Sequence, residues 1–302
     1  MDAERGSGGH AGVSNAALFG ALALGVAAIG AAAIFIRLAE ADALAIAAYR
    51  MVVGAGAVGV FALITARRQF AAVRREDAPW LLLAGAFLAA HFAAWIASLQ
   101  LTSLANSVFL VTTTPVFAAL GSHFAMRDRV GALMAFAVAL SVAGGLVLAT
   151  GEAGGAGHLG GDALAAVGAV AMGGNLLVGR KVRRRVPFLP YVTIIYAIAA
   201  VLLCAAALGS GARMTGLPTD AYLWIALAGL IPQAVGHSTL NWALAHAPAT
   251  TVAMSTRGEP IIATLLAIPV LGEVPPWTIL PGGALLFAGV ALAVRSEMQA
   301  RA

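Results

Sequence analysis

The chain has 302 residues, of which 61% are hydrophobic and only 10% are charged. Soluble domains carry about 25% charged residues, so this composition excludes a soluble protein and favours a chain that crosses a lipid bilayer repeatedly. The net charge of +5 does not indicate nucleic-acid binding, because the basic residues occur in short tracts between apolar runs, where they set membrane topology.

The chain begins with a glycine-rich segment, residues 1–15, which we expect to be a disordered cytoplasmic tail. The apolar run that follows is longer than the roughly 7–15 residues of a signal-peptide core and predicts a retained helix. A helix needs about 20 apolar residues to cross the hydrocarbon layer, and ten runs approach or exceed this length. They lie at residues 16–36, 44–65, 79–99, 103–125, 130–150, 162–179, 188–209, 220–244, 249–271 and 276–294.

The charges in the short connectors predict the orientation of the chain. Ten spans place both termini on the same side of the membrane. That side receives fourteen of the eighteen lysine and arginine residues, and the opposite side receives Arg37 and Arg213. Because cytoplasmic loops are enriched in basic residues, we expect both termini in the cytoplasm.

The two halves of the chain resemble each other when the sequence is shifted by 145 residues. Pro115 then aligns with Pro260, and Asp128 aligns with Glu273. A proline within a helix removes one backbone donor and frees a carbonyl group. We therefore expect helix breaks at Pro115 and Pro260 in the fourth and ninth spans.

Five spans per half is an odd number, so the halves insert with opposite orientations, as in many secondary transporters. The predicted fold is an all-α membrane protein of ten transmembrane helices, built as two inverted five-helix repeats around a central cavity. The first repeat covers residues 16–150 and the second covers residues 162–294, followed by a cytoplasmic tail at residues 295–302.

Glycine is abundant in the predicted spans, where small residues allow membrane helices to pack closely. We interpret these glycines as packing positions, with hinges for alternating access as the functional alternative. Residues 54–59 match the dinucleotide-binding pattern G-x-G-x-x-G. That pattern is meaningful only at a strand-to-helix turn, so we interpret it as part of a membrane span.

Three charged residues, Arg50, Arg257 and Glu259, lie within predicted spans. Such residues are costly in lipid, by about 2.5–3.5 kcal/mol on insertion scales, and usually face a cavity or a partner. Arg257 and Glu259 are two residues apart, about 200° around a helix, so they point to different faces. Each is either an interhelical partner or a contact for a substrate or a coupling ion. We expect Arg50 to extend toward the outer interface of the membrane.

Polar and aromatic residues mark the third and eighth spans. The pair His91 and Trp95, and the pair His237 and Asn241, are spaced i, i+4 and share a helix face. Such a face is too polar for lipid, so it contacts either a neighbouring helix or a substrate in a cavity. The predicted substrate-binding residues are His91, Trp95, Asn175, Gln233, His237, Asn241, Trp242, Arg257 and Glu259. Asn106, Thr112, Thr113 and Thr114 in the fourth span have the same two interpretations.

Sequence signatures of enzymes and metal sites are missing. The spans contain no pair of carboxylates for acid–base catalysis, the chain has no H-E-x-x-H or Cys/His cluster, and it has no G-x-S-x-G elbow. The single cysteine, Cys204, lies in an apolar run and is expected to be a packing residue. We predict no enzymatic activity, no cofactor and no metal; a membrane enzyme or lipid-handling protein is the alternative from another class.

Several motifs resemble the EamA family of the drug/metabolite transporter superfamily over residues 16–294. They are Tyr49-Arg50, Asn106-Ser107-Val108 ahead of Pro115, Gly161-Asp162, Glu259-Pro260 and Leu271-Gly272-Glu273. One departure is Asp128-Arg129, where Glu-Arg is usual. The resemblance implies ten helices in two EamA repeats, with a central cavity lined by spans one, three, four, six, eight and nine.

Within that family, the chain looks most like exporters of amino acids and related metabolites, including the YddG type. The resemblance implies an inner-membrane carrier with a central substrate cavity. From the residues, we predict that it works by alternating access, with Glu259 meeting an ammonium group and Arg257 a carboxylate. Efflux of lipophilic cations is the alternative, with Glu259 as the cavity acid. We expect facilitated diffusion, with proton coupling through Glu259 as the alternative, and a monomer or weak oligomer in the lipid bilayer that binds a small-molecule substrate.

Overall fold

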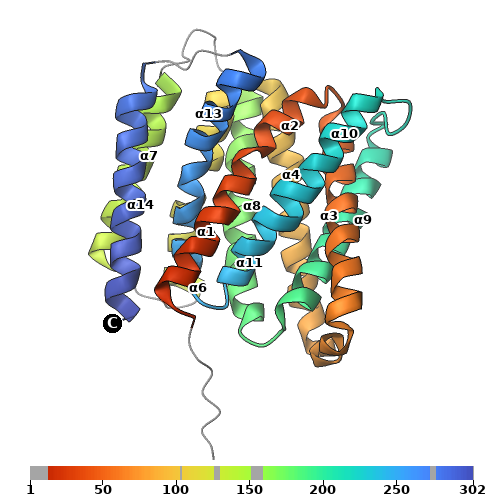
Figure 1. The fold of residues 1–302 in the computed structure, drawn as a ribbon, viewed down its shortest axis with the longest axis horizontal. Coiled ribbons are helices and arrows are strands. Elements are labelled where there is room, and N and C mark those ends of the chain that lie inside the picture. Colours follow the sequence, from red (N-terminus) through yellow and green to blue (C-terminus); the bar gives the residue numbers. More distant parts are fainter. Residues whose placement is uncertain (1–12, 103, 126–129, 151–158, 273–276, 302) are drawn as a thin grey trace, which may run out of the picture.

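The computed structural model describes residues 13–102, 104–125, 130–150, 159–272 and 277–301, and these residues form a bundle of helices (Figure 1). The start of α1 (Asn15–Gly30) and the end of α14 (Ile279–Arg301) lie at the same end of the bundle. We call this end the terminal end and the opposite one the distal end. The predicted motif residues Arg127, Asp128, Arg129 and Glu273 lie outside the described residues, as does most of the predicted N-terminal tail.

The helices follow the predicted ranges closely. The first half contains α1 (Asn15–Gly30), α2 (Ala32–Leu38), α3 (Ala43–Thr65), η1 (Arg67–Ala72), η2 (Arg75–Asp77), α4 (Ala78–Leu101), α5 (Leu104–Val111), α6 (Thr114–Ala125) and α7 (Ala132–Thr150). The second half contains α8 (Leu159–Arg183), α9 (Phe188–Gly209), α10 (Thr219–Ala228), η3 (Gly229–His237), α11 (Ser238–Ala243), α12 (Ala249–Ser255), η4 (Thr256–Gly258), α13 (Glu259–Leu271) and α14.

Seven helical stretches in the described part of the chain are long and apolar enough to cross a membrane. They lie in the first, second, third, sixth, seventh, eighth and tenth predicted ranges. The fourth, fifth and ninth ranges hold shorter helices, so the count of ten spans stays a prediction. The last helix also continues to Arg301, past the predicted end of the tenth span at residue 294.

Two of the predicted ranges contain broken helices. α5 ends at Val111 and α6 begins at Thr114, where the hydroxyl of Thr114 donates to the carbonyl of Val111 at 2.7 Å. In the second half, α12 is separated from α13 by the short turn η4. Pro115 and Pro260 are the second residues of α6 and α13, a position where a missing amide hydrogen costs little because first-turn amides have no helical partner.

The packing of the helices has the pattern of two related halves. α4 in the first half packs along α8 in the second half. The helix equivalent to α4 in the second half is formed by η3 and α11, and the helix equivalent to α8 in the first half is α1. These two also pack together. Among the other large pairs, α3 packs with α9 and α7 packs with α14, and each of these joins equivalent helices of the two halves. The contact of α4 with α9 has its counterpart in the contact of α3 with η3. Exchanging the halves therefore leaves this set of pairs unchanged, as expected for two repeats related by a pseudo-two-fold axis.

The pair α7 and α14 packs through glycine. A Cβ atom added at Gly144 would lie 2.7 Å from the carbonyl oxygen of Gly282, and one added at Gly289 would lie 2.8 Å from the carbonyl oxygen of Ala137. These neighbours are backbone atoms that cannot turn away. The interpretation of glycine as a packing residue is therefore supported at these contacts, since close approach is what small residues permit between membrane helices.

The outer surface of the bundle carries large apolar side chains. Ile64 is 77% exposed, Phe124 is 76% exposed and Leu202 is 42% exposed. Apolar surface in this amount suits hydrocarbon rather than water. Cys204 is half-buried and forms no disulfide.

Polar contacts join the two halves at both ends of the bundle. At the terminal end, the guanidinium of Arg185 pairs with the carboxylates of Glu76 and Asp77. At the distal end, the amide of Arg213 donates to Asp42 Oδ2 at 2.6 Å. A further distal contact runs from the hydroxyl of Thr102, beyond the end of α4, to Asp162 Oδ1 of α8 at 2.7 Å.

Candidate functional site

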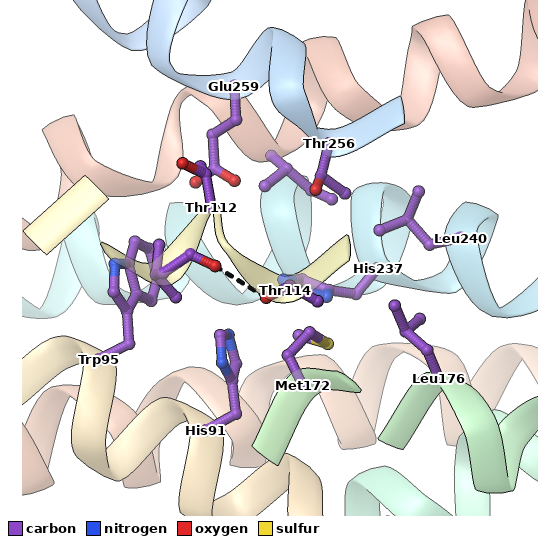
Figure 2. Close-up of a pocket in the computed structure, with 12 residues that line it drawn as sticks. His91, Trp95, Thr112, Thr114, Met172, Leu176, His237, Leu240, Thr256 and Glu259 are labelled. Carbon is purple, nitrogen blue, oxygen red and sulfur yellow. Dashed lines mark hydrogen bonds between the residues drawn. The ribbon is translucent and has the colours of Figure 1, made fainter. Parts of the chain in front are cut away.

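A cavity of about 40 Å³ lies in the interior between the two halves (Figure 2). The first half contributes Ile29, His91, Trp95, Val111, Thr112 and Thr114, and the second half contributes Met172, Leu176, His237, Leu240, Thr256 and Glu259. The lining elements occupy the first, third, fourth, sixth, eighth and ninth predicted ranges. These are the spans that the family resemblance implies for a central cavity.

The cavity is small. A water molecule needs at least 10–15 Å³ by this kind of measure, so the space holds roughly three waters and is too small for an amino acid. A solute of that size therefore requires the surrounding helices to move apart. The broken helices α5–α6 and α12–α13 both reach the cavity wall, which places the breaks where such movement is needed.

Two histidines from equivalent helices meet at the cavity. His91 comes from α4 and His237 from η3, and their ring centroids are 6.4 Å apart. His91 Nδ1 lies 2.9 Å from the carbonyl oxygen of Gly168. A carbonyl only accepts hydrogen bonds, so Nδ1 carries the proton, and in the neutral ring Nε2 is then an acceptor.

The indole ring of Trp95 forms the aromatic wall. It stacks on His91 with an angle of 10° between the rings and a centroid distance of 5.9 Å. Both side chains project from α4 toward the space that Glu259 approaches from the opposite side (Figure 2). Trp95 Nε1 is buried and makes no hydrogen bond to any described residue.

Among the described residues that line the cavity, Glu259 is the one that carries a charge. It is the first residue of α13, where the partial positive charge of a helix N-terminus favours a carboxylate. Arg257 is fully buried and does not line the cavity. The two side chains therefore differ in their surroundings, in keeping with the angle of about 200° between them on a helix.

Arg50 does not extend to the membrane interface, so that expectation is wrong. Its side chain is fully buried, and its guanidinium carbon lies 4.2 Å from the ring centroid of Phe92 and 5.9 Å from that of Trp95. The physical reason is that α4 offers two aromatic faces that attract a cation. Arg50 thus sits directly behind the cavity wall.

The other predicted substrate-binding residues lie outside the cavity lining. Asn175 Nδ2 donates to the carbonyl of Ala84 at 2.9 Å and ties α8 to α4. Asn241 Nδ2 donates to the carbonyl of His237 at 2.9 Å. Trp242 lines a separate groove on the outside of the bundle, together with Phe61. Gln233 is fully buried and is also outside the lining.

The lining residues that were not predicted as substrate-binding are apolar or carry a hydroxyl group. Ile29, Met172 and Leu176 are typical of any membrane span, and nothing in their spacing distinguishes a cavity wall from helix packing. Thr112 and Thr114 flank the break in the fourth span, and the sequence predicts that they contact either a neighbouring helix or a substrate.

Comparison with known proteins identifies the family. Residues 15–150 and again residues 159–295 match the EamA-like transporter family. The chain belongs to this family. The two separate matches also show two EamA repeats, and the protein is an integral membrane protein of the transporter class.

Two individual proteins are similar to this EamA-like transporter. The "Uncharacterized transporter YdfC" of Bacillus subtilis (strain 168) is 24% identical over 247 residues, which cover 81% of this chain and 79% of that protein. A protein of known crystal structure superposes with a TM-score of 0.77 at 20% identity, over 94% of this chain and 99% of its own. The second likeness shows the fold alone.

Proposed function

We propose that this EamA-like transporter exports amino acids, including apolar and aromatic ones, or closely related small metabolites across the cytoplasmic membrane. In this proposal the chain crosses the membrane ten times, its repeats are inverted, and its termini and the basic terminal end face the cytoplasm. The excess of basic residues at that end supports this orientation.

The observation that carries the proposal is the chemistry of the cavity wall. Glu259 supplies a carboxylate for an ammonium group on one side. Trp95, Met172 and Leu176 supply apolar and aromatic surface for a side chain. A site of this kind, mostly apolar with a few placed polar groups, is typical for small-molecule ligands.

Alternating access requires contacts that open in turn at the two ends of the bundle. Ion pairs of Arg185 with Glu76 and Asp77 join the halves at the terminal end, and the Arg213–Asp42 contact joins them at the distal end. In our proposal, these contacts close the two ends. Transport then proceeds by helix movement around a site shared between the repeats. In our proposal, the solute moves down its own gradient.

The test is uptake of labelled amino acids into proteoliposomes that contain the purified protein, with and without a pH gradient. We expect at least one apolar or aromatic amino acid to move faster than in protein-free vesicles, and the pH gradient not to be required. If no amino acid exceeds the rate in protein-free vesicles, the proposal is wrong.

Efflux of lipophilic cations is the second candidate, and Glu259 favours it because a single cavity acid is what such a substrate requires. The substitution Glu259→Gln separates the two. For an amino-acid exporter, we expect Glu259→Gln to reduce amino-acid transport at least about tenfold, since a buried hydrogen bond to a charged group contributes about 1.5–3 kcal/mol. If the variant retains amino-acid transport and loses only cation efflux, the second candidate is correct.

A further inference from the structure

Among the described residues, the buried guanidinium of Arg50 has no hydrogen-bond partner. Arg50 Nε, Nη1 and Nη2 are all buried, and none makes a hydrogen bond to a described residue. A guanidinium has five N–H donors, and leaving a buried charge unpaired is strongly destabilising. The two aromatic rings that it contacts neutralise only part of this cost. The arrangement therefore calls for an anionic partner.

Glu259 is the acid among the described residues of the cavity lining, yet it does not pair with Arg50. No ion pair or hydrogen bond joins the two side chains among the described residues. The guanidinium of Arg50 therefore has no carboxylate partner in this part of the chain.

Two more donors without partners surround the same place. The Gln233 side chain contacts α3 at Gly54, one helical turn after Arg50, and a Cβ atom at residue 54 would lie 2.6 Å from Gln233 Cγ. Both the amide nitrogen and the amide oxygen of Gln233 are buried without a hydrogen bond to a described residue. Trp95 Nε1 is likewise buried without a hydrogen bond to a described residue. Three different elements, α3, α4 and η3, therefore bring unpaired polar groups together.

We infer that Arg50, with Trp95 and Gln233 as further donors, is the carboxylate-binding part of the substrate site. Together with Glu259 it holds the two ends of a zwitterionic amino acid, whose ammonium meets Glu259 and whose carboxylate meets Arg50 once the helices part to admit it. This inference rests on the proposed function and names the chemistry of its substrate: a molecule with both a free amine and a free carboxylate.

The inference also distinguishes Arg50 from Arg257. Both guanidinium groups are buried and lack hydrogen bonds to described residues. Arg50 lies against the ring of Trp95, which lines the cavity, and against that of Phe92. Among the described residues, no aromatic ring makes a contact of this kind with Arg257, so we assign the carboxylate to Arg50 rather than to Arg257.

The experiment varies both partners of the proposed contact. The ligands are L-phenylalanine, L-phenylalanine amide, which lacks the negative charge, and phenethylamine, which lacks the carboxyl group. Each is tested for inhibition of labelled L-phenylalanine uptake into proteoliposomes and for thermal stabilisation of the purified protein. The variants are Arg50→Gln, Arg50→Lys and Trp95→Phe, with Arg257→Gln as the competing assignment and the exposed Arg68→Gln as the control for charge loss.

We expect the wild type to prefer phenylalanine over its amide by about tenfold or more. Arg50→Gln should remove this preference while binding of phenethylamine stays within about twofold, an effect that a merely structural arginine would not produce. Arg50→Lys should keep part of the preference because lysine retains the charge but not the planar fork. Arg68→Gln should keep all of it.

Several results would overturn the inference. They are an unchanged preference in Arg50→Gln, loss of the preference in Arg257→Gln alone, or a wild type that transports phenylalanine and its amide equally. If Arg50→Gln does not fold, Trp95→Phe decides, because it keeps an aromatic ring and removes the N–H donor. An unchanged preference in Trp95→Phe would also contradict the inference. A wild type that binds phenethylamine but moves no amino acid would instead refute the proposed function itself.

Discussion

His91 illustrates how a neighbouring helix can orient a cavity side chain. Its Nδ1 donates to the carbonyl oxygen of Gly168, which leaves Nε2 as an acceptor. The ring is therefore held between α8 and the indole of Trp95, and the acceptor that it offers suits an ammonium group or a hydroxyl group.

We expect His91→Phe to keep the aromatic stacking on Trp95 and to lose both hydrogen-bonding nitrogens. Transport of the best amino-acid substrate should fall at least severalfold, and the free energy of unfolding should fall by about 1 kcal/mol because one buried hydrogen bond is removed. Uptake into proteoliposomes and thermal unfolding in detergent measure the two effects. His123→Phe changes an exposed histidine and should alter neither; equal effects of both variants would refute the role of His91.

At the scale of the element, the eighth predicted range shows what the sequence leaves open. Its length, its polar face and both ends follow from hydropathy, yet its middle is the π-helix η3, with Pro232 inside it. The i, i+4 argument assumes a regular α-helix, and a π-helix has a wider turn. As a result His237 reaches the cavity, Gln233 turns toward α3, and Trp242 lies on the outside of the bundle.

The polar residues of the cavity were accessible to prediction because they stand out in apolar runs. His91, Trp95, His237 and Glu259 stand out in this way, and all four line the cavity; their contact with a substrate stays a prediction. The burial of Arg50 was not predictable, because it depends on Phe92, and the sequence does not indicate which aromatic ring a neighbouring helix presents. The overall arrangement of helices was predictable for a simpler reason: span length and proline position are local properties, whereas side-chain contacts depend on the tertiary packing.

The glycine contact between α7 and α14 gives a prediction at the same scale. We expect Gly289→Ala to destabilise the protein by about 1–3 kcal/mol, because the new methyl group meets the backbone of α7 and overpacking forces the helices apart. Gly283→Ala lies on the same helix and meets nothing within 4 Å. It should be neutral or stabilise by up to about 1 kcal/mol, since alanine favours a helix more than glycine does. Thermal unfolding of both variants is the measurement, and equal destabilisation would contradict the packing interpretation.

At the scale of the whole molecule, ion pairs of Arg185 join the two halves at the terminal end. Arg185 belongs to the loop after α8, while Glu76 and Asp77 belong to the short helix before α4. Asp77 also accepts from the backbone amide of Arg74 at 2.9 Å. This carboxylate is thus fixed in place within the first half, and Arg185 reaches it from the second.

We expect Arg185→Gln to change thermal stability little, because partly exposed ion pairs contribute little to it. In an alternating-access carrier, the same change should favour opening at the terminal end. It should therefore raise the labelling of a cysteine placed at Thr114 by a membrane-impermeant reagent added from that side, in a background with Cys204→Ser. Arg184→Gln, at the exposed neighbouring position, is the control. Labelling that stays equal in the two variants would show that the ion pairs do not restrict opening.

The small volume of the central cavity has a kinetic consequence. A solute larger than the resting cavity must move the helices apart as it enters, so part of its binding free energy is used to deform the protein. The affinity of a solute and its rate of transport can then vary independently. Among solutes of similar chemistry, the fastest need not be the one that saturates the carrier at the lowest concentration.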